Sequence, residues 1–131
     1  MQSKLSTALA VLALIGLADM ASHSARAHEG DNGPHGGQVV EVKGHHVEFT
    51  TKGGEITVYL SDEAEAAIPS KGATGRAVIL EGAKQSTVPL TPAEPNLLTA
   101  KLEAALAAGA RVVVSAKLAD GHDILARFVV K

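Results

Sequence analysis

Short stretches in which apolar and polar residues alternate constrain the fold of this chain more than any other feature. They occupy residues 39–43, 46–50, 55–60, 76–81, 85–90, 97–102, 111–118 and 123–130. This period-two pattern is typical of strands that turn one face to a core. Gly-containing turn signals separate the stretches, among them Lys52-Gly53-Gly54, Gly82-Ala83-Lys84 and Asp120-Gly121. We therefore predict an all-β fold, a small antiparallel β-sandwich or barrel of about 7–8 strands.

The first two stretches predict a hairpin whose register decides which polar side chains meet. Gly44-His45 is the expected two-residue turn, because glycine suits the first central position of a type II′ turn. The pairs that follow from this turn are Val42 with Val47 and Val40 with Phe49 on the core side, and Lys43 with His46 and Glu41 with Glu48 on the other side.

The chain begins with the pattern of a secretory signal peptide. Lys4 supplies a positive charge, Leu5 to Leu17 form a largely apolar run, and Ala25-Arg26-Ala27 is a small-x-small cleavage site. The run is shorter than the roughly 20 apolar residues that span a bilayer. We expect cleavage after Ala27, so that residues 1–27 are removed and a periplasmic protein without membrane insertion remains; an uncleaved anchor helix is the alternative.

Composition narrows the choice of partner and ligand. Cleavage would remove Lys4, Arg26 and Asp19, which changes the net charge from −2 to −3. This mild acidity and the lack of a basic run argue against nucleic acid as a partner. The chain has no cysteine, so a thiolate metal site is excluded and any ion must be held by nitrogen and oxygen.

Histidines and carboxylates gather in the segment that precedes the first strands. Residues 28–37, with the turn Gly33-Pro34-His35-Gly36-Gly37, have no apolar periodicity and predict a flexible His-rich arm before a β domain at 38–131. His46 and Glu48 are two apart on one strand and therefore project from the same face. With Glu41 from the neighbouring strand, and with His35 folded over, they could hold a divalent transition metal such as Cu, Zn, Ni or Co. An ordinary polar sheet face, with Lys43 pairing a carboxylate, is the alternative.

Three further histidines differ in how well they could bind a metal ion. Cleavage after Ala27 would make His28 the amino terminus, where its amine and ring nitrogen can chelate copper together. His45 is a further candidate ligand, although a turn position would leave it merely exposed. His122 is expected to be a bystander in a hairpin turn. The sequence contains no nucleophile motif and no zinc-protease motif, so we expect no enzymatic activity.

Several short motifs resemble a known group of proteins. They are His28-Glu29-Gly30, Gly33-Pro34-His35-Gly36-Gly37, Gly44-His45-His46-Val47-Glu48, Gly72-Ala73-Thr74-Gly75 and Val88-Pro89-Leu90-Thr91-Pro92. The chain thereby resembles small periplasmic His-rich metal-resistance proteins, and domains of heavy-metal RND efflux adaptor proteins. The resemblance implies a secreted β domain linked to copper, zinc, cobalt or nickel handling. The hairpin and lipoyl-like regions of a full adaptor are absent from this sequence.

The sequence thus leads to one function and one rival from another class. The leading hypothesis is a periplasmic transition-metal-binding protein that acts as a buffer, a carrier or an accessory to heavy-metal efflux. Its candidate ligands are His28, His35, Glu41, His45, His46 and Glu48. The rival is an interaction module that docks on an efflux complex and carries its histidines incidentally. A copper-dependent oxidative enzyme built on His28 is a weaker third reading.

Overall fold

The computed structural model describes residues 32–131 of the chain. The predicted signal peptide (1–27), His28 and the rest of 28–31 lie outside the described residues. Across the described part, no helix is long and apolar enough to cross a membrane.

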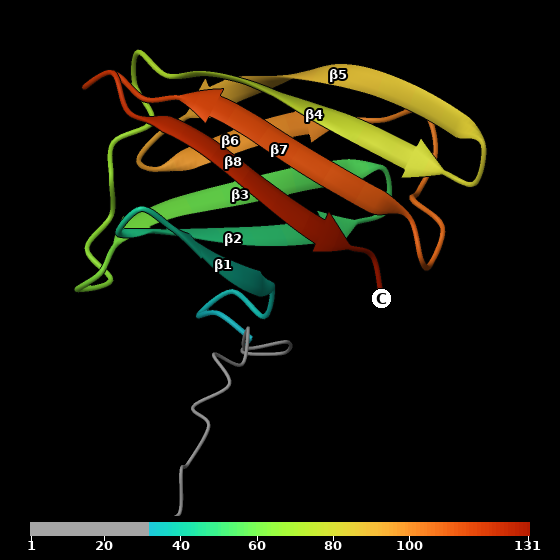
Figure 1. Cartoon of the computed structure of the whole chain (residues 1–131), viewed down its shortest axis with the longest axis horizontal. Helices are drawn as coiled ribbons and strands as arrows, with labels where there is room; N and C mark the ends of the chain where they lie inside the picture. Colours follow the sequence, from blue (N-terminus) through green and yellow to red (C-terminus); the bar gives the residue numbers. More distant parts are fainter. Residues whose placement is uncertain (1–31) are drawn as a thin grey trace, which may run out of the picture.

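Eight antiparallel strands form one sheet that curls into a nearly closed barrel, so the all-β prediction is confirmed (Figure 1). The sheet order is β1-β2-β3-β6-β5-β4-β7-β8. The strands are β1 (Gln38–Val42), β2 (His45–Lys52), β3 (Glu55–Asp62), β4 (Thr74–Glu81), β5 (Lys84–Ala93), β6 (Leu97–Lys101), β7 (Arg111–Lys117) and β8 (Asp123–Val129).

Strand β5 joins the two halves of the barrel. Its first part, up to Leu90, pairs with β4, and its last three residues, from Thr91 to Ala93, pair with β6. The two ends of the sheet order, β1 and β8, meet at a seam. Among the described residues no backbone ladder joins these strands; the Gln38 side chain donates a hydrogen bond across the seam to the carbonyl of Val129.

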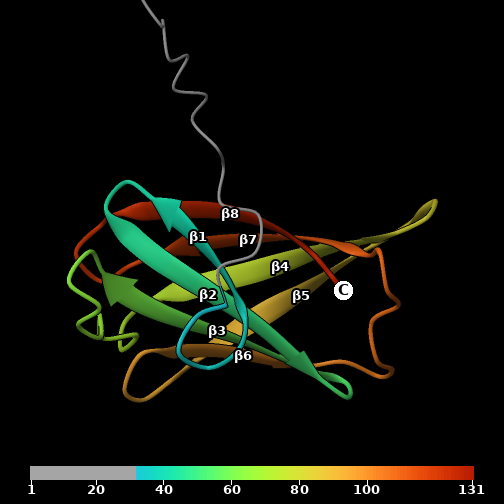
Figure 2. The ribbon, with the colours of Figure 1, turned by 90° about the horizontal axis from the view of Figure 1, so that it is seen from below.

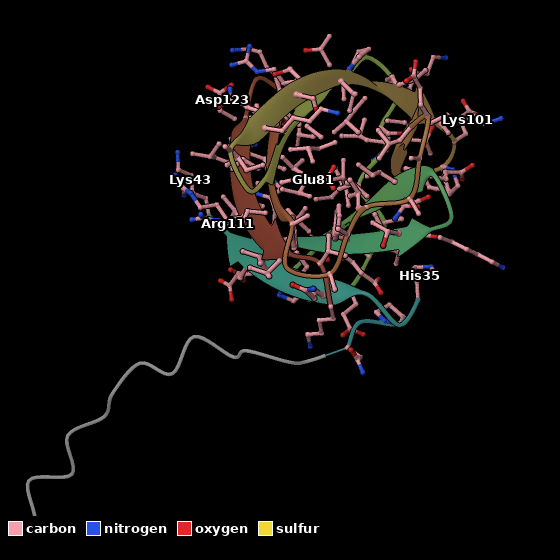
Figure 3. The ribbon with its side chains drawn as sticks, turned by 90° about the vertical axis from the view of Figure 1, so that its right-hand side faces the viewer. His35, Lys43, Glu81, Lys101, Arg111 and Asp123 are labelled. Atoms are coloured by element: carbon pink, nitrogen blue, oxygen red, sulfur yellow. The ribbon has the colours of Figure 1, made fainter. Side chains whose placement is uncertain are left out.

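The core fills the inside of the barrel and is almost entirely aliphatic (Figure 3). The inward positions of each strand supply it, as the alternation predicts, and Val47, Ile56, Val58 and Val112 are fully buried. The two phenylalanines, Phe49 and Phe128, stack with ring centroids 4.8 Å apart. Burial of apolar side chains stabilises the fold by roughly 1.5–3 kcal/mol for each of the larger ones.

The register predicted for the first hairpin is wrong. The turn is Lys43-Gly44, with both residues at positive φ (49° and 78°), and Val42 pairs with His45. Positive φ at both central positions marks a type I′ turn. Lysine is uncommon at such a position, and this is why the sequence indicated a turn that begins at Gly44. The observed pairs are Val39 with Glu48, Val40 with Val47 and Glu41 with His46. The shift of two positions keeps every side chain on its predicted face.

The described part of the predicted flexible arm is a hydrogen-bonded turn. Gly33 donates its N–H to the carbonyl of Gly37 (2.8 Å), and Gly36 donates to the carbonyl of Gly33 (2.9 Å). An isolated bridge between Asn32 and Gln38 closes the turn. In Figure 2, which views the molecule from below, this segment loops across the outside of β2 and β3 instead of extending away from the barrel.

The core assignment predicts a sharp contrast between two valines. Val47 is fully buried in β2, whereas Val129 in β8 is 50% exposed. Val47→Ala should lower the free energy of unfolding by about 2 kcal/mol, because a cavity replaces buried methyl groups. Val129→Ala should change it by less than about 0.5 kcal/mol. Urea unfolding followed by circular dichroism measures both, and equal effects would contradict the assigned inward face.

Candidate metal sites

The polar side chains that the sequence placed on one face of the first hairpin do share the outer face of the barrel. We call this group the outer-face site; it comprises His35, Glu41, His46, Glu48 and Tyr59. Strand pairing brings several of these side chains together. Glu41 lies opposite His46, and Glu48 lies between Val39 on β1 and Tyr59 on β3. His35 comes from the turn before β1, which folds over this face.

The Glu48 carboxylate holds that turn in place. Its Oε1 accepts the backbone N–H groups of His35 (2.9 Å) and Gly37 (3.0 Å), and its Oε2 lies 2.7 Å from His35 Nδ1. Glu48 is only 4% exposed although it faces outward, because the turn covers it. Buried carboxylates are stable only where donors replace the water they lose. Glu48 is therefore an anchor for the turn, with little capacity left to bind an ion directly.

Two glycines permit the turn to lie this close to the sheet. A Cβ on Gly33 would stand 2.4 Å from the Glu48 carboxyl carbon, and a Cβ on Gly37 would stand 2.4 Å from the carbonyl oxygen of Phe49. Both distances are far inside van der Waals contact, so any side chain here would push the turn away. Steric contact with the sheet thus explains why the first and last positions of the Gly-Pro-His-Gly-Gly motif are glycine.

His35 is fixed in orientation and in tautomer. Its ring stacks on Tyr59 with centroids 3.6 Å apart and planes 3° from parallel. An ionised carboxylate only accepts hydrogen bonds, so the ring proton belongs on Nδ1 and the lone pair on Nε2. The His35 side chain is 44% exposed. Carboxylate-held histidines with a free second nitrogen are the usual arrangement in metal sites.

A groove of about 990 Å³ lies beside this ring. His35, Glu41, His46 and Glu48 all line it, and its other polar lining residues are Asn32, Tyr59, Ser61, Glu65 and Asn96. These ligand atoms do not gather at one point. Within residues 32–131, the one group of three or more potential ligands whose atoms lie within 4.8 Å of one another is His45, Asp120 and His122.

We call that second group the end cluster. His45 begins β2, while Asp120 and His122 belong to the turn between β7 and β8. The His45 and His122 rings meet edge to face, with centroids 5.2 Å apart. His122 Nδ1 lies 2.8 Å from Asp120 Oδ2, and the His122 backbone N–H donates to Asp120 Oδ1 (2.9 Å).

The hydrogen bond from the His122 backbone N–H, followed by the one from its ring, lowers the pKa of Asp120 below its usual value. Asp120 is therefore ionised at neutral pH and available to a cation. His122 is predicted from the sequence to be a bystander, because only the meeting of two hairpin turns that are distant in sequence brings it to His45. In the sequence, only the adjacent residues Asp120-Gly121-His122 pointed to a possible site here.

The predicted ligands thus fall into three places. His35, Glu41, His46 and Glu48 belong to the outer-face site, with His35 bonded to Glu48 and the others along the same groove. His45 points away from that face and joins the end cluster. His28 lies outside the described residues.

The role of Glu48 generates a test by substitution. Glu48→Gln keeps an oxygen for the two backbone N–H groups but points an amide N–H₂ at His35 Nδ1. The ring should then switch tautomer and carry its proton on Nε2, where it blocks a metal ion. We expect a 10–100-fold loss of metal affinity by calorimetry, with a folded barrel by circular dichroism. Glu55→Gln, which changes an exposed glutamate of β3 that does not line the groove beside His35, is the matched control, and an equal loss there would contradict the anchor role.

Comparisons with protein-family models, with curated proteins and with solved structures found no significant match to this chain.

Proposed function

We propose that this chain is a periplasmic transition-metal-binding protein that buffers or carries the ion, or serves heavy-metal efflux as an accessory. The observation that carries the proposal is the His35–Glu48 pair. A buried carboxylate holds Nδ1 at 2.7 Å and leaves Nε2 as a lone-pair donor on a half-exposed ring. Such pre-orientation lowers the entropic cost of binding an ion.

The surroundings of His35 favour a cation and specify its class. The groove wall carries the carboxylates of Glu41 and Glu65 and a second imidazole, His46, and no lysine or arginine lines it. Imidazole nitrogen with carboxylate oxygen suits Cu²⁺, Zn²⁺, Ni²⁺ and Co²⁺. Calcium, which takes six to eight oxygen ligands, is a poor fit for such a set.

Tyr59 offers a direct optical test of this proposal. It is the single tyrosine of a chain without tryptophan, and its ring stacks on His35. Cu²⁺ bound at His35 should quench Tyr59 fluorescence in a saturable titration, and Zn²⁺, Ni²⁺ and Co²⁺ should be compared in parallel. His35→Ala should abolish the saturable change, while His122→Ala, which alters a histidine far from Tyr59, should preserve it.

Two results would contradict the proposal. One is a Tyr59 response that is the same in His35→Ala as in the parent protein. The other is calorimetric binding that persists in His35→Ala and disappears on deletion of residues 28–31, which would assign the ion to those residues alone.

The groove also supports the rival function, an interaction module for a partner protein. Its volume of about 990 Å³ is much larger than an ion requires, and Pro34, Val39 and Tyr59 add apolar surface to it. Val39→Ser, which removes apolar surface from the groove without adding a charge, should then weaken capture of an efflux adaptor while metal uptake stays unchanged. Loss of metal uptake without loss of capture would rule this candidate out.

A further inference from the structure

We propose that the end cluster is a second and separate metal site, which takes one divalent transition ion through the imidazoles of His45 and His122 and the carboxylate of Asp120. The proposal goes beyond the outer-face site, because it uses none of the residues that hold His35. One ligand atom from each of the three side chains already lies within 4.8 Å of the other two. Ligands of a tetrahedral zinc ion are about 3.4 Å apart for bonds of about 2.1 Å. Small side-chain rotations therefore suffice.

His45 is held with its metal-binding nitrogen free. Its Nδ1 lies 3.2 Å from the carbonyl oxygen of Val42 and 3.0 Å from that of Lys43. Both partners are acceptors, so Nδ1 must carry the proton and Nε2 the lone pair. The type I′ turn at Lys43-Gly44 places these two carbonyls, and it thereby sets the tautomer of His45.

His122 is positioned by a different partner. Asp120 Oδ1 accepts the backbone N–H of His122, and Asp120 Oδ2 lies 2.8 Å from His122 Nδ1. An ion that replaces the proton between Nδ1 and Oδ2 would be bound by both atoms. The side chains of His122 and Asp120 are 64% and 54% exposed, so an ion can enter from solvent. The Glu63 carboxylate lies beside Gly44 and adds negative charge to this end of the barrel.

The two sites lie on opposite faces of β2. His46 projects outward with Glu48, whereas His45 lies opposite Val42 and turns toward His122. In Figure 3, which looks into the barrel, Lys43 and Asp123 mark the two turns of the end cluster and lie on the side away from His35. Binding at one site therefore leaves the ligands of the other untouched.

The position of the end cluster gives the ion a structural effect. It would link the β1–β2 turn to the β7–β8 turn, and these turns carry the two strands at the open seam of the barrel. The bound ion is a cross-link between elements far apart in sequence. Because it requires the folded arrangement, it stabilises the folded state by mass action.

A Zn²⁺ titration of the purified protein tests the proposal. Ring signals of His45 and His122 should shift together in histidine-selective NMR with one equivalent of Zn²⁺, and Ca²⁺ should have no effect. The same equivalent should raise the melting temperature. His122→Ala should remove that calorimetric equivalent and the thermal shift, and Asp120→Asn should weaken the affinity about tenfold or more.

Two further variants serve as matched controls for this titration. Asp123→Asn changes an exposed aspartate of the same hairpin, paired with Lys117 at 3.5 Å, and should bind as the parent does. His35→Ala should retain the end-cluster equivalent and lose only the Tyr59 response, so failure of the two proposals is distinguishable. An unchanged stoichiometry and thermal shift in both His122→Ala and Asp120→Asn would overturn the second site.

Discussion

One buried carboxylate, that of Glu48, ties the residues before the barrel to its outer face. Hydrogen bonds to a charged group contribute about 1.5–3 kcal/mol each, and a buried carboxylate that loses its donors costs several kcal/mol. Glu48 accepts such bonds from His35 and Gly37. The outer face of β2 and the turn at 33–37 are therefore stable only together. The tautomer of His35, its stacking on Tyr59 and the wall of the groove all follow from this contact.

Much of the fold could be predicted from the sequence because strand alternation is a local property. Each strand has its own inward aliphatic residues, so the eight segments and their buried faces were visible one at a time. Face assignment on β2 survived even the wrong register, since a shift of two positions preserves the side on which a residue lies. The turn itself was missed because Lys43 occupies a left-handed conformation that lysine rarely adopts.

The candidate sites were predictable only where their residues are neighbours along the chain or across one hairpin. His46, Glu48 and Glu41 met that condition, and the folding back of His35 was a reasonable extension. The Glu48 carboxylate accepts backbone N–H groups only because Gly33 and Gly37 approach the sheet so closely, and the sequence does not show this approach. The end cluster required the closure of the barrel, which brings the 43–45 and 120–122 turns together over a wide separation in sequence. No local pattern contains that information.

The central claim is that His35 Nε2 binds a transition metal while Glu48 keeps hold of Nδ1. Anomalous X-ray diffraction at the zinc edge, from crystals of the zinc-loaded protein, tests it most directly. We expect an anomalous peak at roughly 2.0–2.1 Å from His35 Nε2, with the Glu48 contact intact. Zinc found elsewhere in the protein, with no peak at His35, would contradict it.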